Sequence, residues 1–169
     1  MDQICEAVGI TQRTFFNHYS TKEDALLGLD LPQLNQQRAR EYLADPAVGV
    51  LSGAIALIEF PAIYLDEPAF ATAQLRLLAG SSALRSRQAE RFAPVALELE
   101  ELVYLKLRAP NGNDATDGEL RQRASLVISL GAGLLNRVAL AAIDDPAAIK
   151  PGAAEELFDL LRPIWQSLL

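Results

Sequence analysis

Four consecutive polar residues near the start of the chain carry the side chains best suited to recognising another molecule. Thr11, Gln12, Arg13 and Thr14 offer hydroxyl, amide and guanidinium groups, which can form hydrogen bonds with the edges of DNA bases. They would line the first turn of a short helix, with Thr11 as its N-cap. The pattern therefore predicts a nucleic-acid contact surface.

Two short helices and a tight turn must position these side chains. We expect one helix at 2–8, ended by Gly9, and a second at 12–19, with Phe15 and Tyr19 turned inward. Two short helices joined by a glycine-containing turn are typical of the helix-turn-helix motif, whose second helix enters the major groove of DNA.

The residues around these helices extend the same prediction. Ile10 should face the core from the turn, and Thr21 should cap a third helix that begins at Lys22. A phosphate is favoured at such a helix N-terminus, because unpaired N–H groups and the positive end of the helix dipole meet there.

The run DQICEAVGITQRTFFNHYSTKEDALL, residues 2–27, resembles the DNA-binding region of the TetR family. That family's pattern has an Ile–Ala pair, a glycine turn, a Ser/Thr cap, an aromatic–x–(His/Tyr)–Phe run and a Lys-Glu-x-Leu segment. The match covers 26 of the 169 residues. The resemblance implies base contacts from Gln12, Arg13 and Thr14, and phosphate contacts from Thr11, Phe16, His18 and Lys22.

The first 30 residues depart from the family pattern in identifiable ways. Phe16 stands where the family usually has Tyr, and Tyr19 where it has Phe. Residues 1–30 hold two basic and five acidic side chains, a net charge of −3, whereas phosphate neutralisation normally drives DNA affinity. The family also has a helix before the one that contains Ile4, so we expect the gene to encode such a helix upstream of Met1.

The rest of the chain predicts an all-α fold, because apolar residues recur at helical spacing and alternation of period two is almost absent. Further helices are expected at 22–43, 48–65, 69–79, 83–108, 117–143 and 153–168. Thr116 and Glu119 form a capping-box pattern. We therefore predict two parts: a helix-turn-helix head with its connecting helix at 1–43, and a helical ligand-binding and dimerisation domain at 44–169.

An apolar stretch in the middle of the chain is expected to be either plain core or the wall of a ligand cavity. The resemblance favours a cavity, since TetR-family proteins enclose their inducer in this region. The arginines between 76 and 87 should lie on a solvated face. The candidate pocket residues are Glu59, Phe60, Tyr64, Phe70, Gln74, Leu78, Phe92, Val95, Leu99, Ser129 and Asn136.

Two apolar seams with alternating spacings of four and three residues suit helices packed in a bundle. Either both seams face their own core, or they form a two-fold four-helix interface. The resemblance favours the interface, because TetR-family proteins dimerise through their last two helices. The predicted interface residues are Leu120, Ala124, Val127, Gly131, Leu134 and Val138 in one seam, and Leu157, Leu161, Ile164 and Leu168 in the other.

Composition and motifs argue against other classes of protein. Half of the residues are hydrophobic and 22 % are charged, which excludes a disordered chain, and the net charge of −7 excludes a general polyanion binder. One His and one Cys cannot build a metal cluster or a His-based catalytic triad, so we expect no enzyme, metal or cofactor. The long apolar stretches at 47–65 and 126–143 contain Glu59 and Arg137, which argues for buried helices in a cytoplasmic protein, not membrane spans.

The sequence thus favours a homodimeric TetR-like repressor that binds a pseudo-palindromic operator in double-stranded DNA. A small apolar or amphipathic effector would release it. The alternative is a dimeric helical protein that binds a small molecule without effective DNA binding.

Overall fold

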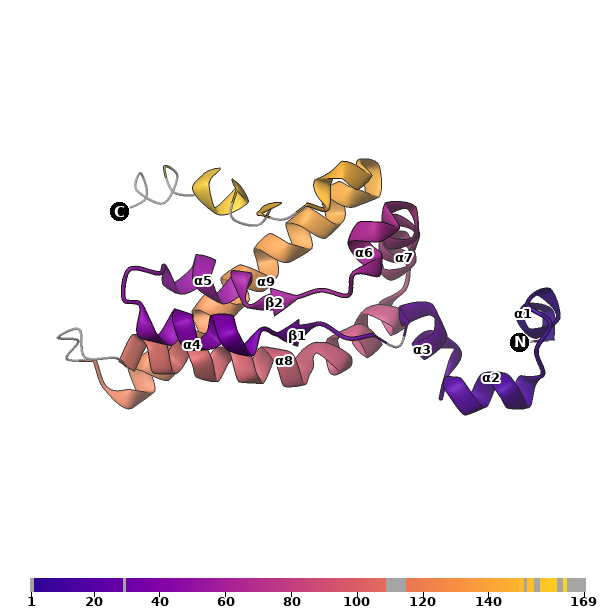
Figure 1. The fold of residues 1–169 in the computed structure, drawn as a ribbon, viewed down its shortest axis with the longest axis horizontal. Coiled ribbons are helices and arrows are strands. Elements are labelled where there is room, and N and C mark those ends of the chain that lie inside the picture. Colours follow the sequence, from indigo (N-terminus) through magenta and orange to yellow (C-terminus); the bar gives the residue numbers. More distant parts are fainter. Residues whose placement is uncertain are drawn as a thin grey trace.

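The computed structural model describes residues 2–28, 30–108, 115–150, 152–153, 156–160 and 163. Nine α-helices and a two-stranded sheet lie in these residues, which confirms the all-α fold class. Figure 1 shows an elongated molecule. Two short helices project at one end, and the long helices pack together towards the other.

The first three helices are α1 (Asp2–Ala7), α2 (Gln12–His18) and α3 (Lys22–Leu27), which we call the head. The turn after α1 places Gly9 at a φ of 68°, a conformation that glycine adopts readily. The hydroxyl of Thr11 accepts a hydrogen bond from the N–H of Thr14 at 3.1 Å, and Thr21 caps α3 in the same way through Asp24 at 3.0 Å. The predicted turn and both predicted caps are confirmed.

The expected helix at 22–43 is wrong, because α3 ends at Leu27 and is followed by Gly28, whose φ is 76°. The chain then passes Pro32 into β1 (Gln33–Leu34) before α4 begins (Gln36–Ala44). Proline disfavours the helical conformation in the residue before it, so the chain runs extended at this point. The helix that was to connect head and body is therefore a short extended connector.

The expected helix at 48–65 is also wrong. In its place the chain forms α5 (Val50–Ala56), β2 (Ile58–Glu59) and α6 (Ile63–Asp66). Pro61 lacks the N–H that a continuing helix would need. The two strands pair antiparallel, with Leu34 opposite Ile58, so the two interruptions stabilise each other.

Three longer helices complete the body, which we define as everything after residue 32. They are α7 (Pro68–Gly80), α8 (Ser82–Arg108) and α9 (Asp117–Asp144), each within one residue of its predicted bounds. A short 3-10 helix, η1 (Pro146–Ala148), follows α9, and residues 156–160 are helical. The capping box at the start of α9 is formed as predicted: Thr116 accepts from the N–H of Glu119, whose carboxylate accepts from the N–H of Thr116.

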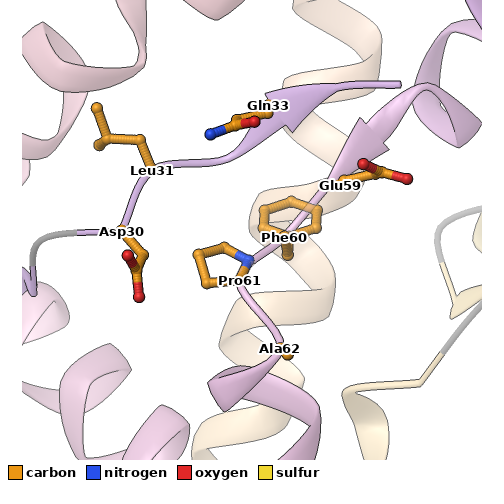
Figure 2. Close-up of a pocket in the computed structure, with 7 residues that line it drawn as sticks. All are labelled: Asp30, Leu31, Gln33, Glu59, Phe60, Pro61 and Ala62. Atoms are coloured by element: carbon orange, nitrogen blue, oxygen red, sulfur yellow. The ribbon is translucent and has the colours of Figure 1, made fainter. Parts of the chain in front are cut away.

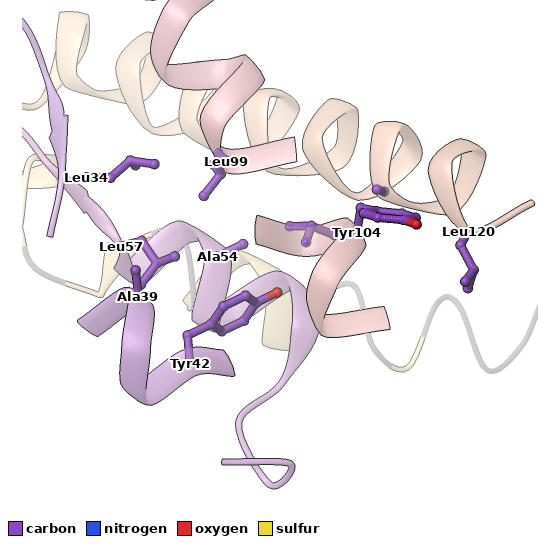
Figure 3. Packing of buried hydrophobic residues seen from close by; sticks show 10 residues of the cluster. Leu34, Ala39, Tyr42, Ala54, Leu57, Leu99, Tyr104 and Leu120 are labelled. Atoms are coloured by element: carbon purple, nitrogen blue, oxygen red, sulfur yellow. The ribbon is translucent and has the colours of Figure 1, made fainter. Parts of the chain in front are cut away.

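The main core lies between α4, α5, α8 and α9 (Figure 3). Tyr42 is 2 % exposed, and its hydroxyl donates to the carbonyl of Val50 at 3.0 Å. Gly53 lies against the ring of Tyr42, where an added Cβ would stand 2.6 Å from the ring. The cluster of buried residues comprises Leu34, Ala39, Tyr42, Ala54, Leu57, Leu99, Val103, Tyr104, Leu120 and Ala124.

Candidate functional site

The residues predicted to face DNA bases lie exposed on the first turn of α2. Gln12, Arg13 and Thr14 are all exposed. The helix that carries them, α2, lies at the end of the molecule away from the body (Figure 1). Phe15 behind them is 5 % exposed, and its ring centroid lies 5.3 Å from that of Tyr19. The inward aromatic pair expected from the sequence is present, and it fixes which face of α2 points outward.

Hydrogen bonds and charges around α2 are few. Gln12 donates its side-chain amide to the carboxylate of Asp2, which links the start of α2 to α1. Arg13 forms no ion pair with any residue that the structure describes. The Nζ of Lys22 lies 3.7 Å from a carboxylate oxygen of Glu23, and the lysine side chain is 67 % exposed.

The predicted phosphate-contacting residues all lie at or near the surface of the head. Thr11 and His18 are exposed, and Phe16 is 49 % exposed with its ring edge-on to that of Phe15. In this arrangement the side chains of all three residues are accessible to a phosphate. Phe16 carries no hydroxyl and can contribute only apolar contact.

One prediction about the head is wrong: Ile10 does not face a core. It is 37 % exposed, and Val8 beside it is 62 % exposed, whereas Cys5 is 4 % exposed. In the described part of the chain, α1 meets α2 and no other element to a comparable extent, so nothing covers the outer side of the turn. The apolar side chains of the turn therefore form an exposed patch.

The head is attached to the body through α3. The Nε of Arg87 on α8 donates to Oδ1 of Asp24 at 2.9 Å, and its Nη2 donates to Oδ2 at 3.3 Å. These hydrogen bonds lower the pKa of the Asp24 carboxyl, against the opposing effect of desolvation. A second arginine, Arg91, donates to the carbonyl of Gly28 at 2.6 Å. Two arginines of α8 thus hold α3 and its C-terminal end.

A buried amide makes a further link between head and body. Gln74 on α7 is 5 % exposed and donates to the carbonyl of Leu26 at 2.9 Å, and it accepts from the hydroxyl of Tyr64 at 2.7 Å. Burial raises the pKa of the Tyr64 hydroxyl, so it remains a neutral donor at neutral pH. Tyr64 and Gln74 were predicted to line a ligand pocket, but here they bind each other and the end of α3.

The arginines between 76 and 87 lie at the surface, as the sequence suggested, with Arg76 and Arg85 exposed and Arg87 half-buried, and they also bind other parts of the chain. Arg76 donates to the carbonyl of Ile143 at 2.8 Å, at the end of α9. Arg85 donates to the carbonyls of Leu78 and Ala79, at the end of α7. Helix C-termini leave carbonyls unpaired, and cations are favoured there. The sequence could not identify the carbonyls that accept these hydrogen bonds, because they belong to a different helix from the arginine that donates.

An open pocket of about 310 Å³ lies beside the connector (Figure 2). Its walls are Asp30 and Leu31 from the connector, Gln33 from β1, and residues 59–62 from the segment that begins at the end of β2. Of the predicted pocket residues, Glu59 and Phe60 line it. The other lining residues were not predicted. The prolines Pro32 and Pro61, which interrupt two predicted helices, could have indicated that the chain is extended at this place.

The other predicted pocket residues do not line this pocket, and their part in ligand binding stays a prediction. Leu99 belongs to the main core and Val95 packs against it, because they occupy the buried stripe of α8. Phe70 is 41 % exposed on α7, while Leu78 and Phe92 are half-buried. The polar pair on α9 faces outward: Ser129 and Asn136 are both exposed.

The apolar seam of α9 packs within its own chain, as the first of the two alternatives held. Leu120, Ala124 and Leu134 are 7 % exposed or less, and Gly131 lies against Leu51 and Ile55. Val127 packs on the main core and Val138 on a smaller cluster. The buried members of this seam are therefore not accessible to a second copy, whereas Val127 and Val138 are half-buried. In the second seam, Leu157 packs on the smaller cluster, and Leu161, Ile164 and Leu168 lie outside the described residues.

The opposite side of α9 carries the exposed apolar surface. Leu126, Leu130 and Leu140 are 58 %, 51 % and 44 % exposed, and an added Cβ on Gly133 would meet nothing within 4 Å. The positions follow the same spacing of four, three and seven residues, displaced around the helix from the buried seam. We call these four residues the outer face of α9.

Two features of the described residues bear on other functional classes. No group of three or more His, Cys, Asp or Glu side chains is placed there to hold a metal ion. One described helix, α9, is long and apolar enough to cross a membrane by length and composition alone. The predicted stretch at 47–65 is divided among α5, β2 and α6.

No protein-family model, curated protein or solved structure matches this chain. A functional assignment must therefore come from its residues and their geometry.

Proposed function

We propose that this chain is a TetR-like, DNA-binding transcriptional regulator, a repressor that a small effector releases from its operator. The observation that supports this most directly is the placement of Gln12, Arg13 and Thr14. They are exposed together on the first turn of a capped helix, and the buried ring of Phe15 fixes the opposite face. In a helix-turn-helix, the N-terminal residues of the second helix contact base edges.

The attachment of the head supports a regulatory role. A regulator must transmit a change in its ligand-binding part to the separation and orientation of its DNA-contacting helices. Here Arg87, Arg91 and Gln74 hold the third helix to the body through hydrogen bonds with Asp24, Gly28 and Leu26. A ligand that prefers one arrangement of these contacts would shift the heads toward or away from the spacing of the operator half-sites.

Dimerisation belongs to the same proposal, because two heads are needed to bind two half-sites one helical turn apart. The outer face of α9 offers the surface for a second copy. It presents exposed leucines at bundle spacing and a glycine that permits close approach of a second helix. The interface residues proposed now are Leu126, Leu130, Gly133 and Leu140, in place of the buried seam.

A mobility-shift assay on DNA from the region upstream of the gene tests the proposal. The protein should retard that DNA at a concentration at which a scrambled duplex of equal length remains free. Equal retardation of both duplexes, or none, would contradict the proposal.

One observation favours the alternative, a dimeric helical protein that binds a small molecule and acts without DNA. Residues 1–30 have five carboxylates against two basic side chains, and one of the carboxylates, Asp2, accepts a hydrogen bond from the amide of Gln12. Phosphate repulsion would weaken any DNA contact. The same mobility-shift assay separates the two functions, since the alternative predicts no specific complex at low salt.

A further inference from the structure

Gln12, one of the residues predicted to read DNA bases, is joined by a hydrogen bond to the other helix of the turn. Its side-chain amide nitrogen, at the first residue of α2, donates to Oδ1 of Asp2, the first residue of α1. Both residues are exposed, so neither polar group needs this contact to compensate for burial. The contact orients a side chain that would otherwise rotate freely in solvent.

The neighbouring recognition residues are not oriented in this way. The hydroxyl of Thr14 lies 3.0 Å from that of Thr11, the N-cap of the same helix. Arg13 has no ion pair among the residues placed in the structure. Gln12 is thus oriented from α1, whereas Thr14 is oriented from within α2. A change in α1 that removes the Asp2 carboxylate should therefore affect Gln12 and leave the other two recognition residues as they are.

The partner of the Gln12 amide determines which of its two ends is which. A glutamine amide has N–H donors at one end and an acceptor oxygen at the other, and a half-turn of the group exchanges them. An ionised carboxylate accepts from the nitrogen and repels the oxygen, so Asp2 favours one of the two orientations. The nitrogen then points towards α1. Oε1 is left as the end that is free to approach a base.

We propose that Asp2 is a positioning residue that makes Gln12 select a base with an exocyclic amino group. In the major groove, the amino groups of adenine and cytosine donate hydrogen bonds, which Oε1 of Gln12 would accept. Guanine and thymine carry a carbonyl oxygen at the corresponding place, and it would meet Oε1 as one acceptor against another. This inference rests on the proposed function, because it names the class of base that one residue of the recognition helix reads.

A second carboxylate on α1 allows the hydrogen bond to be separated from the charge. Glu6 lies one helical turn after Asp2 and is also exposed, but the amide of Gln12 is bound to Asp2. Either carboxylate repels phosphates, which weakens binding to every duplex irrespective of its sequence. Removing the hydrogen bond, by contrast, should change the preference only at the base pair that Gln12 contacts. Glu6→Ala is therefore the matched control for Asp2→Ala.

The orientation of Gln12 can be measured in the full chain without DNA. Nitrogen-15 relaxation of the Gln12 side-chain amide should show restricted motion in the wild type and in Glu6→Ala, and faster motion of larger amplitude in Asp2→Ala. The backbone amide spectrum of each variant establishes that the head is folded. Equal mobility of this side chain in the wild type and in Asp2→Ala would overturn the positioning role, whatever the protein does with DNA.

The base preference is measured on the upstream duplex, shortened to the smallest retarded segment and changed one base pair at a time. The pair whose preference disappears in Gln12→Ala is the pair that this residue reads. There the wild type should prefer adenine or cytosine by about three- to tenfold, as expected for one hydrogen bond. Asp2→Ala should lose this preference and keep those at the other base pairs. Glu6→Ala should bind all duplexes more tightly and keep every preference.

Three results on DNA would also overturn the inference: a preference for guanine or thymine at that pair, a preference unchanged in Asp2→Ala, or a loss at all base pairs together, which would indicate a loosened head. In each case a wild type that still discriminates the upstream DNA leaves the regulator proposal standing. If Asp2 restrains the amide but the wild type binds all duplexes alike, the proposed function is wrong, and the assignment of a base to Gln12 fails with it.

Discussion

Arg87 and Asp24 are 63 positions apart in the sequence, yet two hydrogen bonds join the guanidinium of one to the carboxylate of the other, at 2.9 and 3.3 Å. Planar arginine and carboxylate groups suit such a paired arrangement, which fixes orientation as well as distance. Arg87 lies on α8 and Asp24 on α3, so this pair sets the angle at which the head leaves the body.

Removing this pair should loosen α3. In Arg87→Gln we expect amide hydrogen exchange in α3 to accelerate about two- to fivefold, the range expected for a partly exposed ion pair. Arg40→Gln is the matched control, since Arg40 is exposed on α4 and has no ion pair among the described residues. Adding Asp24→Asn to Arg87→Gln should produce little further change. Unchanged exchange in Arg87→Gln would show that other contacts hold the head.

The same pair predicts a pH dependence with a definite sign. The Arg87 hydrogen bond, with a further one from Thr21, holds the pKa of Asp24 below its ordinary value. The stabilisation is therefore complete above about pH 4, where the unfolded carboxyl is ionised, and is lost as pH falls through the lower pKa of the folded state. A carboxyl-detected NMR titration should give a midpoint for Asp24 that rises in Arg87→Gln. An identical midpoint in both proteins would exclude Arg87 as the main cause.

Two glycines in helices should respond oppositely to alanine. In Gly53→Ala the new Cβ would stand 2.6 Å from the buried ring of Tyr42 and from Cγ1 of Val48. Overpacking typically costs about 1–3 kcal/mol, more than the gain in helix propensity, so the free energy of unfolding should fall. Gly118→Ala, in the first turn of α9 and not among the residues of its outer face, meets nothing and should gain about 0.5–1 kcal/mol. Urea unfolding measures both, and a stabilised Gly53→Ala protein would contradict the packing of this core.

The outer face of α9 predicts the oligomeric state. Leu126→Glu places a charge at a position that is 58 % exposed and, in the proposed dimer, buried against a second copy. The protein should then sediment as a monomer, whereas the wild type sediments as a dimer. Leu77→Glu makes the same chemical change at an exposed leucine of α7 and should leave the dimer intact. A dimer that survives Leu126→Glu would require another interface.

Local features of this fold could be predicted from the sequence because their causes lie within a few residues. Gly9 and the caps at Thr11, Thr21 and Thr116 all act on backbone groups at most three positions away. The bounds of α7, α8 and α9 could be predicted for the same reason, since the spacing of apolar residues and the capping residues define them.

Features that depend on distant segments could not be predicted. The pairing of β1 with β2 joins two stretches of two residues, too short for any alternation to be visible. Lys106 is 8 % exposed and donates to the carbonyls of Tyr42 and Asp45 at the end of α4, which no spacing in the sequence indicates. The side of α9 that faces its own core was uncertain for a related reason. Both sides of the helix are apolar, so periodicity does not distinguish core from interface.

The central claim is that residues 12–14 contact base edges while Lys22 contacts a phosphate, and a comparison of two variants tests it most directly. Binding to the upstream DNA and to a scrambled duplex is measured over a range of salt concentrations for Arg13→Ala and Lys22→Ala. Arg13→Ala should lose about 1–3 kcal/mol on the upstream DNA and little on the scrambled duplex, which removes the discrimination. Lys22→Ala should weaken both complexes alike and reduce the salt dependence by about one counterion. Equal effects of the two substitutions, or discrimination that survives Arg13→Ala, would contradict the account.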